Sequence, residues 1–205
     1  MDGTLLDTRL DIARAANNAR RELGLTQMSV EEVVRAVGDG VNLFVSRVTF
    51  PEAHPRFAEA RAVFMRHYAE NIIGETRPYD GIPSLLVSLK SQGMSMGIVS
   101  NKPAALVDQL VMHFNWQDYF STWLGGDSAP KPKPAADPII MALAKSGLPA
   151  SHPVIMVGDG DQDILAARSV SGRAIWCAWG FNPNPTKDYP SDRADHPDDV
   201  ARFLA

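Results

Sequence analysis

Residues 153–163 read Pro-Val-Ile-Met-Val-Gly-Asp-Gly-Asp-Gln-Asp, a short apolar run followed at once by an acidic turn. The run at 154–157 has the length and composition of a buried strand, bounded by a proline and a glycine. Apolar residues at helical spacing follow at 164–170, and a second strand-like run, Ala-Ile-Trp-Cys, occupies 174–177. Strand, helix and strand in this order predict a βαβ unit, in which two parallel strands lie side by side and the acidic turn follows the first of them.

The same alternation extends through much of the chain before this unit. Apolar runs at 94–99 and 120–124 have strand length, and prolines mark the starts of helical patterns near residues 83, 103 and 138. We therefore expect an α/β fold with a doubly wound parallel sheet, covered by helices on both faces. In such sheets, ligands bind at the edge where the strands end.

Residues 10–73 have a different, wholly helical pattern. Apolar residues recur at helical spacing in four segments, and Ser29-Val30-Glu31-Glu32 has the pattern of a capping box. Gly38-Asp39-Gly40 separates two of the segments and is either a loop that closes over a site or a plain helix–helix turn. We expect a core domain built from residues 1–9 and 74–205, with residues 10–73 inserted as a helical domain on hinges near 6–9 and 74–77.

The composition is that of a globular protein, with 45% apolar and 21% charged residues among 205. The formal net charge of −4 provides no broad positive field, so we expect no nucleic-acid partner. No apolar run approaches the ~20 residues of a membrane span, and no signal-peptide pattern opens the chain. The single cysteine, Cys177, excludes an internal disulfide and is expected to be buried. These features predict a cytoplasmic protein without a membrane partner.

Three aspartates, Asp159, Asp161 and Asp163, follow the strand expected at 154–157. Carboxylates so close together repel one another and raise each other's pKa, and a divalent cation relieves that repulsion. Oxygen ligands favour Mg²⁺. The alternative is a solvated acidic turn in which Asp163 caps the following helix. A calcium loop is excluded because its glycine and glutamate positions are missing.

Two other segments carry groups suited to phosphate. Ser100-Asn101-Lys102-Pro103 follows the strand expected at 94–99 and offers a hydroxyl, backbone N–H groups and a helix start. Lys133 lies in the loop 129–134 between two core strands, where its ammonium group can neutralise phosphate charge. The alternatives are an ordinary helix N-cap and a surface lysine, and neither segment alone decides between them.

Taken together, four segments resemble the motifs of the haloacid dehalogenase superfamily. The segment Asp-Gly-Thr-Leu-Leu-Asp-Thr at 2–8 resembles the first motif, and Ser-Asn-Lys-Pro at 100–103 resembles the second. Lys133-Pro134 is similar to the third motif, and Gly158-Asp159 with Asp163 is similar to the fourth. Their order and separations fit, and the helical insert resembles the superfamily's cap. Further similarities at 79–81, 125–127 and 137–138 point to the phosphoglycolate phosphatase-like branch.

The resemblance implies a role for each matching residue. In this superfamily an aspartate attacks phosphorus to form an aspartyl-phosphate, which water then hydrolyses. Asp2 matches the aspartate that protonates the leaving alcohol and then activates the water, and its backbone carbonyl would contact the metal. Asp159 would be the carboxylate ligand of Mg²⁺, and Asp163 would hold a metal-bound water or Lys133. The phosphoryl group would be held by Gly3, Ser100, Asn101 and Lys133.

The nucleophilic aspartate has no match in this sequence. It should stand two positions before Asp2, and Met1 occupies the position between them. The first core strand, which lies at the centre of the superfamily's sheet, is missing as well. We therefore expect an N-terminal truncation and an inactive, poorly soluble chain. Asp7 and Asp11 are less favoured substitutes for the nucleophile.

The leading interpretation is a Mg²⁺-dependent phosphatase, monomeric or homodimeric, that acts on a small phosphorylated metabolite, with 2-phosphoglycolate as a candidate. A sugar phosphomutase uses the same groups and stays open. A haloacid dehalogenase is disfavoured because it needs neither an acid at Asp2 nor a metal. An alternative from another class is a relic that binds phosphate and Mg²⁺ without turnover. An in-frame upstream strand ending in aspartate would distinguish the enzyme from the relic.

Overall fold

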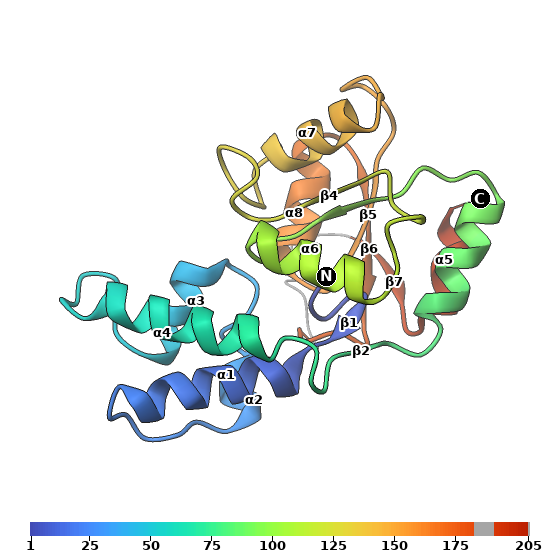
Figure 1. The fold of residues 1–205 in the computed structure, drawn as a ribbon. Helices are drawn as coiled ribbons and strands as arrows, with labels where there is room; N and C mark the ends of the chain where they lie inside the picture. The colour runs from blue at the N-terminus through green and yellow to red at the C-terminus, as the bar shows by residue number, and fades with distance from the viewer. Residues whose placement is uncertain (183–190, 205) are drawn as a thin grey trace.

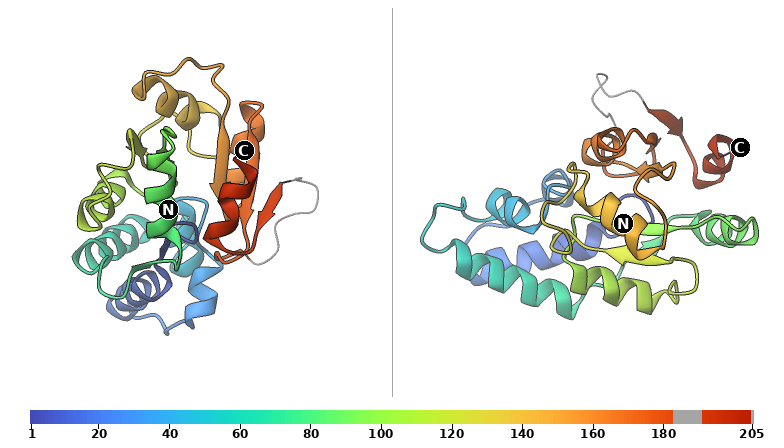
Figure 2. Two further views of the ribbon diagram at one scale, coloured as in Figure 1. Left: turned by 90° about the vertical axis from the view of Figure 1, so that its right-hand side faces the viewer. Right: turned by 90° about the horizontal axis from the view of Figure 1, so that it is seen from above.

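The computed structural model describes residues 1–182 and 191–204. A segment of four helices, called the helical insert, lies to one side of an α/β core (Figure 1). Figure 2, seen from above, shows the insert projecting from the core. The helices of the insert are α1 (Arg9–Glu22), α2 (Val30–Val34), α3 (Val41–Val48) and α4 (Phe57–Glu70).

The packing of α1 against α4 makes the main contact within the insert. On α1, Ala15, Ala16 and Ala19 form a buried stripe of small side chains that lets a second helix approach closely. On α4, Phe64 and Tyr68 are buried in return. Truncating a buried aromatic side chain of this kind costs about 3–5 kcal/mol of stability, so these residues hold the insert together.

The shorter helices follow the local signals of the sequence. At the start of α2, the Glu32 N–H donates to the Ser29 hydroxyl at 3.2 Å, and the Ser29 N–H donates to the Glu32 carboxylate at 2.7 Å. This is the capping box that the sequence predicts. α3 begins after Gly40, whose φ of +91° lies in the region that favours glycine. The loop 38–40 between these helices faces the core.

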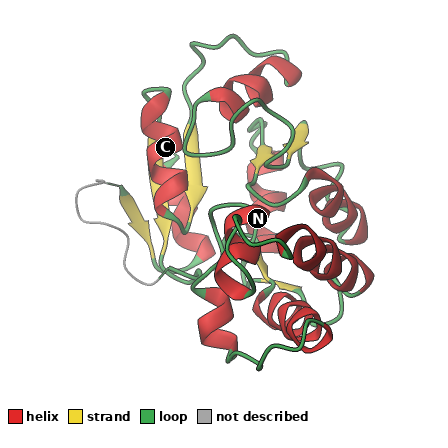
Figure 3. Cartoon of the chain, turned by 90° about the vertical axis from the view of Figure 1, so that its left-hand side faces the viewer, coloured by secondary structure: helices red, strands yellow, loops and turns green. Residues whose placement is uncertain are grey.

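The core contains two groups of parallel strands. β3 (Gly97–Val99) pairs with β4 (Thr122–Leu124), and β6 (Arg173–Cys177) lies between β5 (Ile155–Gly158) and β7 (Asp192–Ala194). Figure 3 shows these short strands beside the helices. The parallel pairings confirm the predicted α/β core. The remaining helices are α5 (Ile82–Ser91), α6 (Ala104–His113), α7 (Asp137–Lys145), α8 (Asp161–Ser169) and the 3₁₀ helix η1 (Pro197–Phe203).

Some element boundaries differ from the sequence prediction. The strand expected at 94–99 begins only at Gly97, because the Met94 N–H bonds back to the Leu89 carbonyl and closes the end of α5. The helix expected to begin at residue 164 begins at Asp161, because the Asp163 carboxylate accepts the Gly160 N–H and caps it.

Four elements carry no periodic signal and were not predicted. They are the paired two-residue strands β1 (Leu6–Asp7) and β2 (Arg77–Pro78), together with β7 and η1. β1 and β2 lie in the two connections between insert and core and pair in antiparallel fashion. Among the described residues, no helix combines the length and the hydropathy needed to cross a membrane.

Candidate active site

The predicted strand ends meet at one cavity of about 420 Å³ between the core and the helical insert. The core contributes Asp2, Ser100, Lys133 and Asp159 to its lining. The insert contributes the loop 38–40 and Tyr68. Asn101 and Asp163 line the cavity as well, whereas Gly3 does not. The fold thus brings together residues that are more than 100 positions apart in the sequence.

The carboxylate of Asp2 is bound by two side chains. The Lys102 ammonium group donates to both carboxylate oxygens, at 2.8 and 3.1 Å, and the Thr8 hydroxyl donates to one of them at 2.8 Å. Burial alone would raise the pKa of Asp2, but Lys102, the Met1 amino group and Thr8 outweigh it and hold the pKa below its ordinary value. Asp2 is therefore ionised and fixed in direction.

Gly3 allows the chain to turn tightly beside Asp159. Its φ is +71°, and a Cβ at this position would lie 2.2 Å from Asp159 Oδ2. Its N–H donates to the Leu6 carbonyl at 3.0 Å. Gly3 therefore shapes the turn, and its contact with phosphate stays a prediction.

The side chain of Asn101 fastens the segment after β3 to two other loops. Its Nδ2 donates to the carbonyls of Gly38 and Lys133, each at 3.0 Å, and its Oδ1 accepts the Lys133 N–H at 3.0 Å. Ser100 is buried beside it, and its hydroxyl oxygen accepts the Lys102 N–H at 3.2 Å. That bond uses the oxygen as an acceptor and leaves the hydroxyl hydrogen as a donor toward a ligand.

Lys133 joins the ends of two strands. Its ammonium group donates to the carbonyl of Val99, the last residue of β3, at 2.6 Å and forms an ion pair with Asp163 in the first turn of α8. Both side chains are buried. Lys131, two residues earlier, is exposed. The structure thus distinguishes the two lysines of this loop and places only Lys133 at the cavity.

Asp159 follows β5 and is enclosed by neutral donors. The Thr4 hydroxyl donates to its Oδ1 at 3.1 Å, and the Phe181 N–H donates to its Oδ2 at 2.8 Å. Burial, reinforced by the neighbouring Asp163 carboxylate, raises the pKa of Asp159. A cation next to Asp159 would relieve both effects.

The oxygen donors at this end of the cavity suit Mg²⁺ in one respect. Mg²⁺ is commonly bound by one or two carboxylates and completes its shell with water and phosphate oxygens. Asp159 supplies one carboxylate, and the Asp2 carbonyl is the second donor that the family resemblance implies. Among the described residues, no three His, Cys, Asp or Glu side chains are grouped closely enough to bind a metal. The residues therefore fit a Mg²⁺ ion that takes its remaining coordination positions from water and from the phosphate oxygens of a bound substrate.

The amino group of Met1 is buried in the same cavity. Burial and the Lys133 ammonium group lower its pKa, against the opposing effect of the nearby aspartates. Lys133 bonds to the end of β3, and Asp159 follows the end of β5. Met1 lines the cavity together with Lys133 and Asp159, the residues at the ends of these two strands.

The loop 38–40 contacts the core at the cavity. The Gly38 carbonyl accepts from Asn101, the Asp39 carboxylate accepts from the Gln162 side chain on α8, and Asp39 pairs with Arg47 on α3 at 2.6 Å. A plain helix–helix turn does not require these contacts. These contacts hold the loop against the core at the cavity, and its closure over the site stays a prediction.

Sequence reasoning missed Lys102 and Tyr68. The signal for Lys102 was available, since it stands in the Ser-Asn-Lys-Pro segment that follows β3. Tyr68 gave no signal, because it continues the apolar stripe of α4 and has the spacing of a core residue.

The chain is similar in sequence and in fold to known proteins. Residues 1–177 match the family model of haloacid dehalogenase-like hydrolases. A phosphoglycolate phosphatase of Aquifex aeolicus (strain VF5) is 33% identical over 198 residues, which cover 94% of this chain and 91% of the relative. One of Thiobacillus denitrificans (strain ATCC 25259 / T1) is 35% identical over 188 residues, covering 89% of this chain and 82% of the relative.

A solved structure shares the fold over the whole length of this chain. The crystal structure of a predicted phosphoglycolate phosphatase from Haemophilus somnus 129PT superposes with a TM-score of 0.91 at 28% identity, covering 100% of this chain and 95% of that one. The family match and these relatives show that the chain belongs to the haloacid dehalogenase-like hydrolase family.

Proposed function

We propose that the protein is a Mg²⁺-dependent phosphatase that hydrolyses a small phosphorylated metabolite through an aspartyl-phosphate. The observation that carries the proposal is the convergence of Asp2, Ser100, Lys133 and Asp159 on one cavity. A fixed carboxylate, a hydroxyl, a buried ammonium group and a candidate metal ligand are the groups that phosphoryl transfer requires. The relatives named phosphoglycolate phosphatase support this activity and make 2-phosphoglycolate the first substrate to test.

The proposed nucleophile is an aspartate two positions before Asp2, which is outside the 205 residues. The buried Met1 amino group supports this position, because a residue joined to Met1 would enter the cavity beside Lys133. Two other acidic residues near Met1 fit less well. Asp7 does not line the cavity and pairs with Arg9, and Asp11 is bound to residues 75 and 76.

The chemistry assigns a step to each group. The aspartate oxygen would bond to phosphorus as the ester P–O bond breaks, and the departing oxygen would receive a proton that Asp2 has first taken up from solvent. Asp2, now ionised, would then take a proton from water as the water oxygen attacks phosphorus and the bond between phosphorus and the nucleophilic aspartate breaks, which releases phosphate and regenerates that carboxylate. Ser100 and Lys133 would bind the phosphoryl oxygens throughout. Mg²⁺, when held by Asp159, would neutralise charge on the phosphoryl group.

The test compares phosphate release from p-nitrophenyl phosphate and 2-phosphoglycolate by three chains. One has the present sequence, one carries an added apolar strand that ends in Asp directly before Met1, and one carries the same strand ending in Asn. We expect Mg²⁺-dependent turnover only from the chain with the added Asp. Equal turnover by the present sequence would contradict the proposed nucleophile.

The metal assignment is tested in the chain with the added Asp. We expect Asp159→Asn to raise the Mg²⁺ concentration needed for half-maximal activity at least tenfold, because the variant loses the metal carboxylate. Asp161→Asn, two residues away in the same turn, is the matched control and should change it little. Equal effects of the two substitutions would show that Asp159 is not the ligand.

A further inference from the structure

Tyr68 reaches from the helical insert into the centre of the candidate site. It lies in the last turns of α4, the helix that runs toward the core in Figure 1. Its side chain is buried, lines the cavity, and is aligned with Phe64 in a stacked pair at 5.5 Å. Packing explains the ring of Tyr68, but a phenylalanine would pack as well, so its hydroxyl group needs a separate explanation.

The hydroxyl of Tyr68 accepts a hydrogen bond from the Lys102 ammonium group. That ammonium group also lies 4.4 Å from the centre of the Tyr68 ring, within the range of a cation–π contact. Its remaining donors go to the two oxygens of Asp2, at 2.8 and 3.1 Å. The Lys102 side chain is only 3% exposed. One cation is therefore held between a residue of the insert and a carboxylate of the core.

The contacts of Lys102 together restrict the conformation of its side chain. An ammonium group has three donors on a flexible stem, and a lysine paired with a carboxylate alone would sample several rotamers. The hydroxyl and ring of Tyr68 add two further contacts to the same ammonium group, which restrict those rotamers. The Thr8 hydroxyl donates at 2.8 Å to Oδ1 of Asp2, which also accepts one of the Lys102 hydrogen bonds.

We propose that Tyr68 and Lys102 are positioning residues for Asp2. Tyr68 holds the Lys102 ammonium group in place, and Lys102 in turn orients the Asp2 carboxylate for proton transfer. The carboxylate therefore has this orientation only when the insert covers the core. This inference rests on the proposed role of Asp2 in proton transfer. It makes the insert part of the machinery that orients the acid–base residue, in addition to its contribution to the cavity lining.

The first measurement needs no turnover. The native chain is treated with an acetylating reagent, and the labelling rate of each lysine is read by mass spectrometry. We expect Lys102 to react at least tenfold more slowly than the exposed Lys131, and Tyr68→Phe to increase its rate severalfold. Tyr119→Phe is the matched control, because the Tyr119 ring lies 5.3 Å from Lys90 in a similar pair far from the cavity. It should leave the Lys102 rate unchanged.

Fast labelling of Lys102 in the unsubstituted chain would overturn the inference, and so would an unchanged rate in Tyr68→Phe. Circular dichroism spectra and melting temperatures are compared first, so that a loss of fold is not taken for a loss of this contact. These outcomes do not depend on whether the protein is a phosphatase.

The second measurement separates positioning from packing, in the chain with the added Asp. With 2-phosphoglycolate, we expect Tyr68→Phe to lower kcat about tenfold while KM changes less than twofold. Lys102→Met should lower kcat further, and Lys102→Arg should recover part of the loss because it retains a cation. If kcat is unchanged in Tyr68→Phe while the enzyme is active, the positioning role fails and the phosphatase assignment stands. If no chain is active, the proposed function fails, and the labelling result still decides whether Tyr68 seats Lys102.

Discussion

At the scale of single residues, the surroundings of the Asp159 carboxylate favour binding of a cation but lower the stability of the folded protein when the carboxylate is ionised. Its hydrogen bonds come from a hydroxyl and a backbone N–H, and its neighbour Asp163 carries the same charge. Asp163, by contrast, is paired with Lys133. Folding therefore raises the pKa of Asp159, and ionising it in the folded protein is unfavourable.

This burial leads to a pH-dependent prediction for Asp159→Asn without Mg²⁺. The pKa of Asp159 is higher in the folded protein than in the unfolded chain. The stability that Asp159 contributes is therefore fully present below the ordinary aspartate pKa, and it is lost as the pH rises through the pKa of the folded protein. The asparagine keeps the shape and an acceptor for Phe181 N–H but never ionises. We expect the variant to gain thermal stability relative to wild type as the pH rises from about 4 to 7.

The measurement is a series of melting curves of both proteins across that pH range. Adding Mg²⁺ should stabilise the wild type more than the variant, because only the wild type retains the carboxylate. A stability difference that is the same at pH 4 and pH 7, or an equal Mg²⁺ effect on the two proteins, would contradict the account of this residue.

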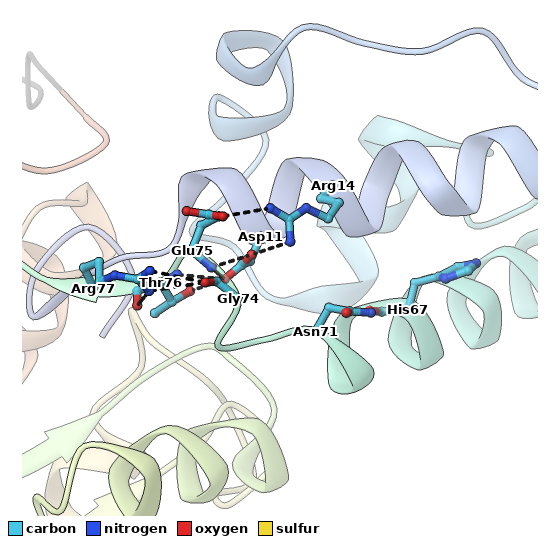
Figure 4. A network of polar contacts seen from close by, with 8 residues as sticks. All are labelled: Asp11, Arg14, His67, Asn71, Gly74, Glu75, Thr76 and Arg77. Carbon is cyan, nitrogen blue, oxygen red and sulfur yellow. Dashed lines mark hydrogen bonds and ion pairs between the residues drawn. The ribbon is translucent and has the colours of Figure 1, made fainter.

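At the scale of elements, the connections between insert and core are fastened together. β1 and β2 pair Leu6 with Pro78 and Asp7 with Arg77. Next to this pair, the carboxylate of Asp11 on α1 accepts the N–H groups of Glu75 and Thr76, at 2.8 Å each, and the Thr76 hydroxyl at 2.8 Å (Figure 4). These contacts are called the linker clamp here. The two segments expected to act as hinges are thus bonded to each other.

The linker clamp predicts a large effect of Asp11→Ala. The substitution leaves two N–H groups and a hydroxyl without their acceptor, and a buried unsatisfied group costs about 1–3 kcal/mol. We expect the free energy of unfolding to fall by about 2 kcal/mol or more, and amide hydrogen exchange at Glu75 and Thr76 to accelerate. Urea denaturation and exchange mass spectrometry measure the two effects.

Asp7→Ala is the control for that substitution. Asp7 lies in the same pair of connections and pairs with Arg9 at 2.7 Å, but its side chain is 34% exposed. An exposed ion pair contributes about 0–1 kcal/mol, so this variant should lose little stability. Similar losses in both variants, or unchanged exchange at Glu75 in Asp11→Ala, would show that the clamp does not hold the connection.

The contrast between predicted and unpredicted elements has a physical cause. Helices such as α1 and α4 repeat an apolar pattern over several turns, and the sequence displays it. The cavity residues after β3 and β5 were predictable because parallel strands end at one edge. β1 and β2 are too short for any period, and the partners of Asp11 lie more than 60 positions away. The contact between Tyr68 and Lys102 likewise forms only when the insert packs on the core.

At the scale of the whole molecule, the core is divided into two hydrogen-bonded groups of strands. β3 pairs with β4, and β5 pairs with β6 and β7, while β3 and β5 are not paired with each other. Met1 is buried and lines the same cavity as Lys133 and Asp159, which lie at the ends of β3 and β5. A strand that ends at Met1 and runs parallel to both would join the two groups into one sheet.

Adding such a strand should therefore change stability independently of catalysis. Burying each apolar side chain gains about 1.5–3 kcal/mol, and ordering each added residue costs about 1–2 kcal/mol of backbone entropy. The additional gain comes from strand hydrogen bonds, each worth about 0.5–1.5 kcal/mol. We expect a six-residue apolar extension ending in Asp before Met1 to raise the free energy of unfolding by a net of about 3 kcal/mol.

Urea denaturation should also show a steeper transition, because a larger surface is buried. The same extension ending in Asn should stabilise equally, whereas a Gly/Ser extension of equal length should not. If the Gly/Ser chain unfolds at the same urea concentration as the apolar one, the two strand groups do not accept a strand between them, and the added aspartate would have to reach phosphorus from a loop.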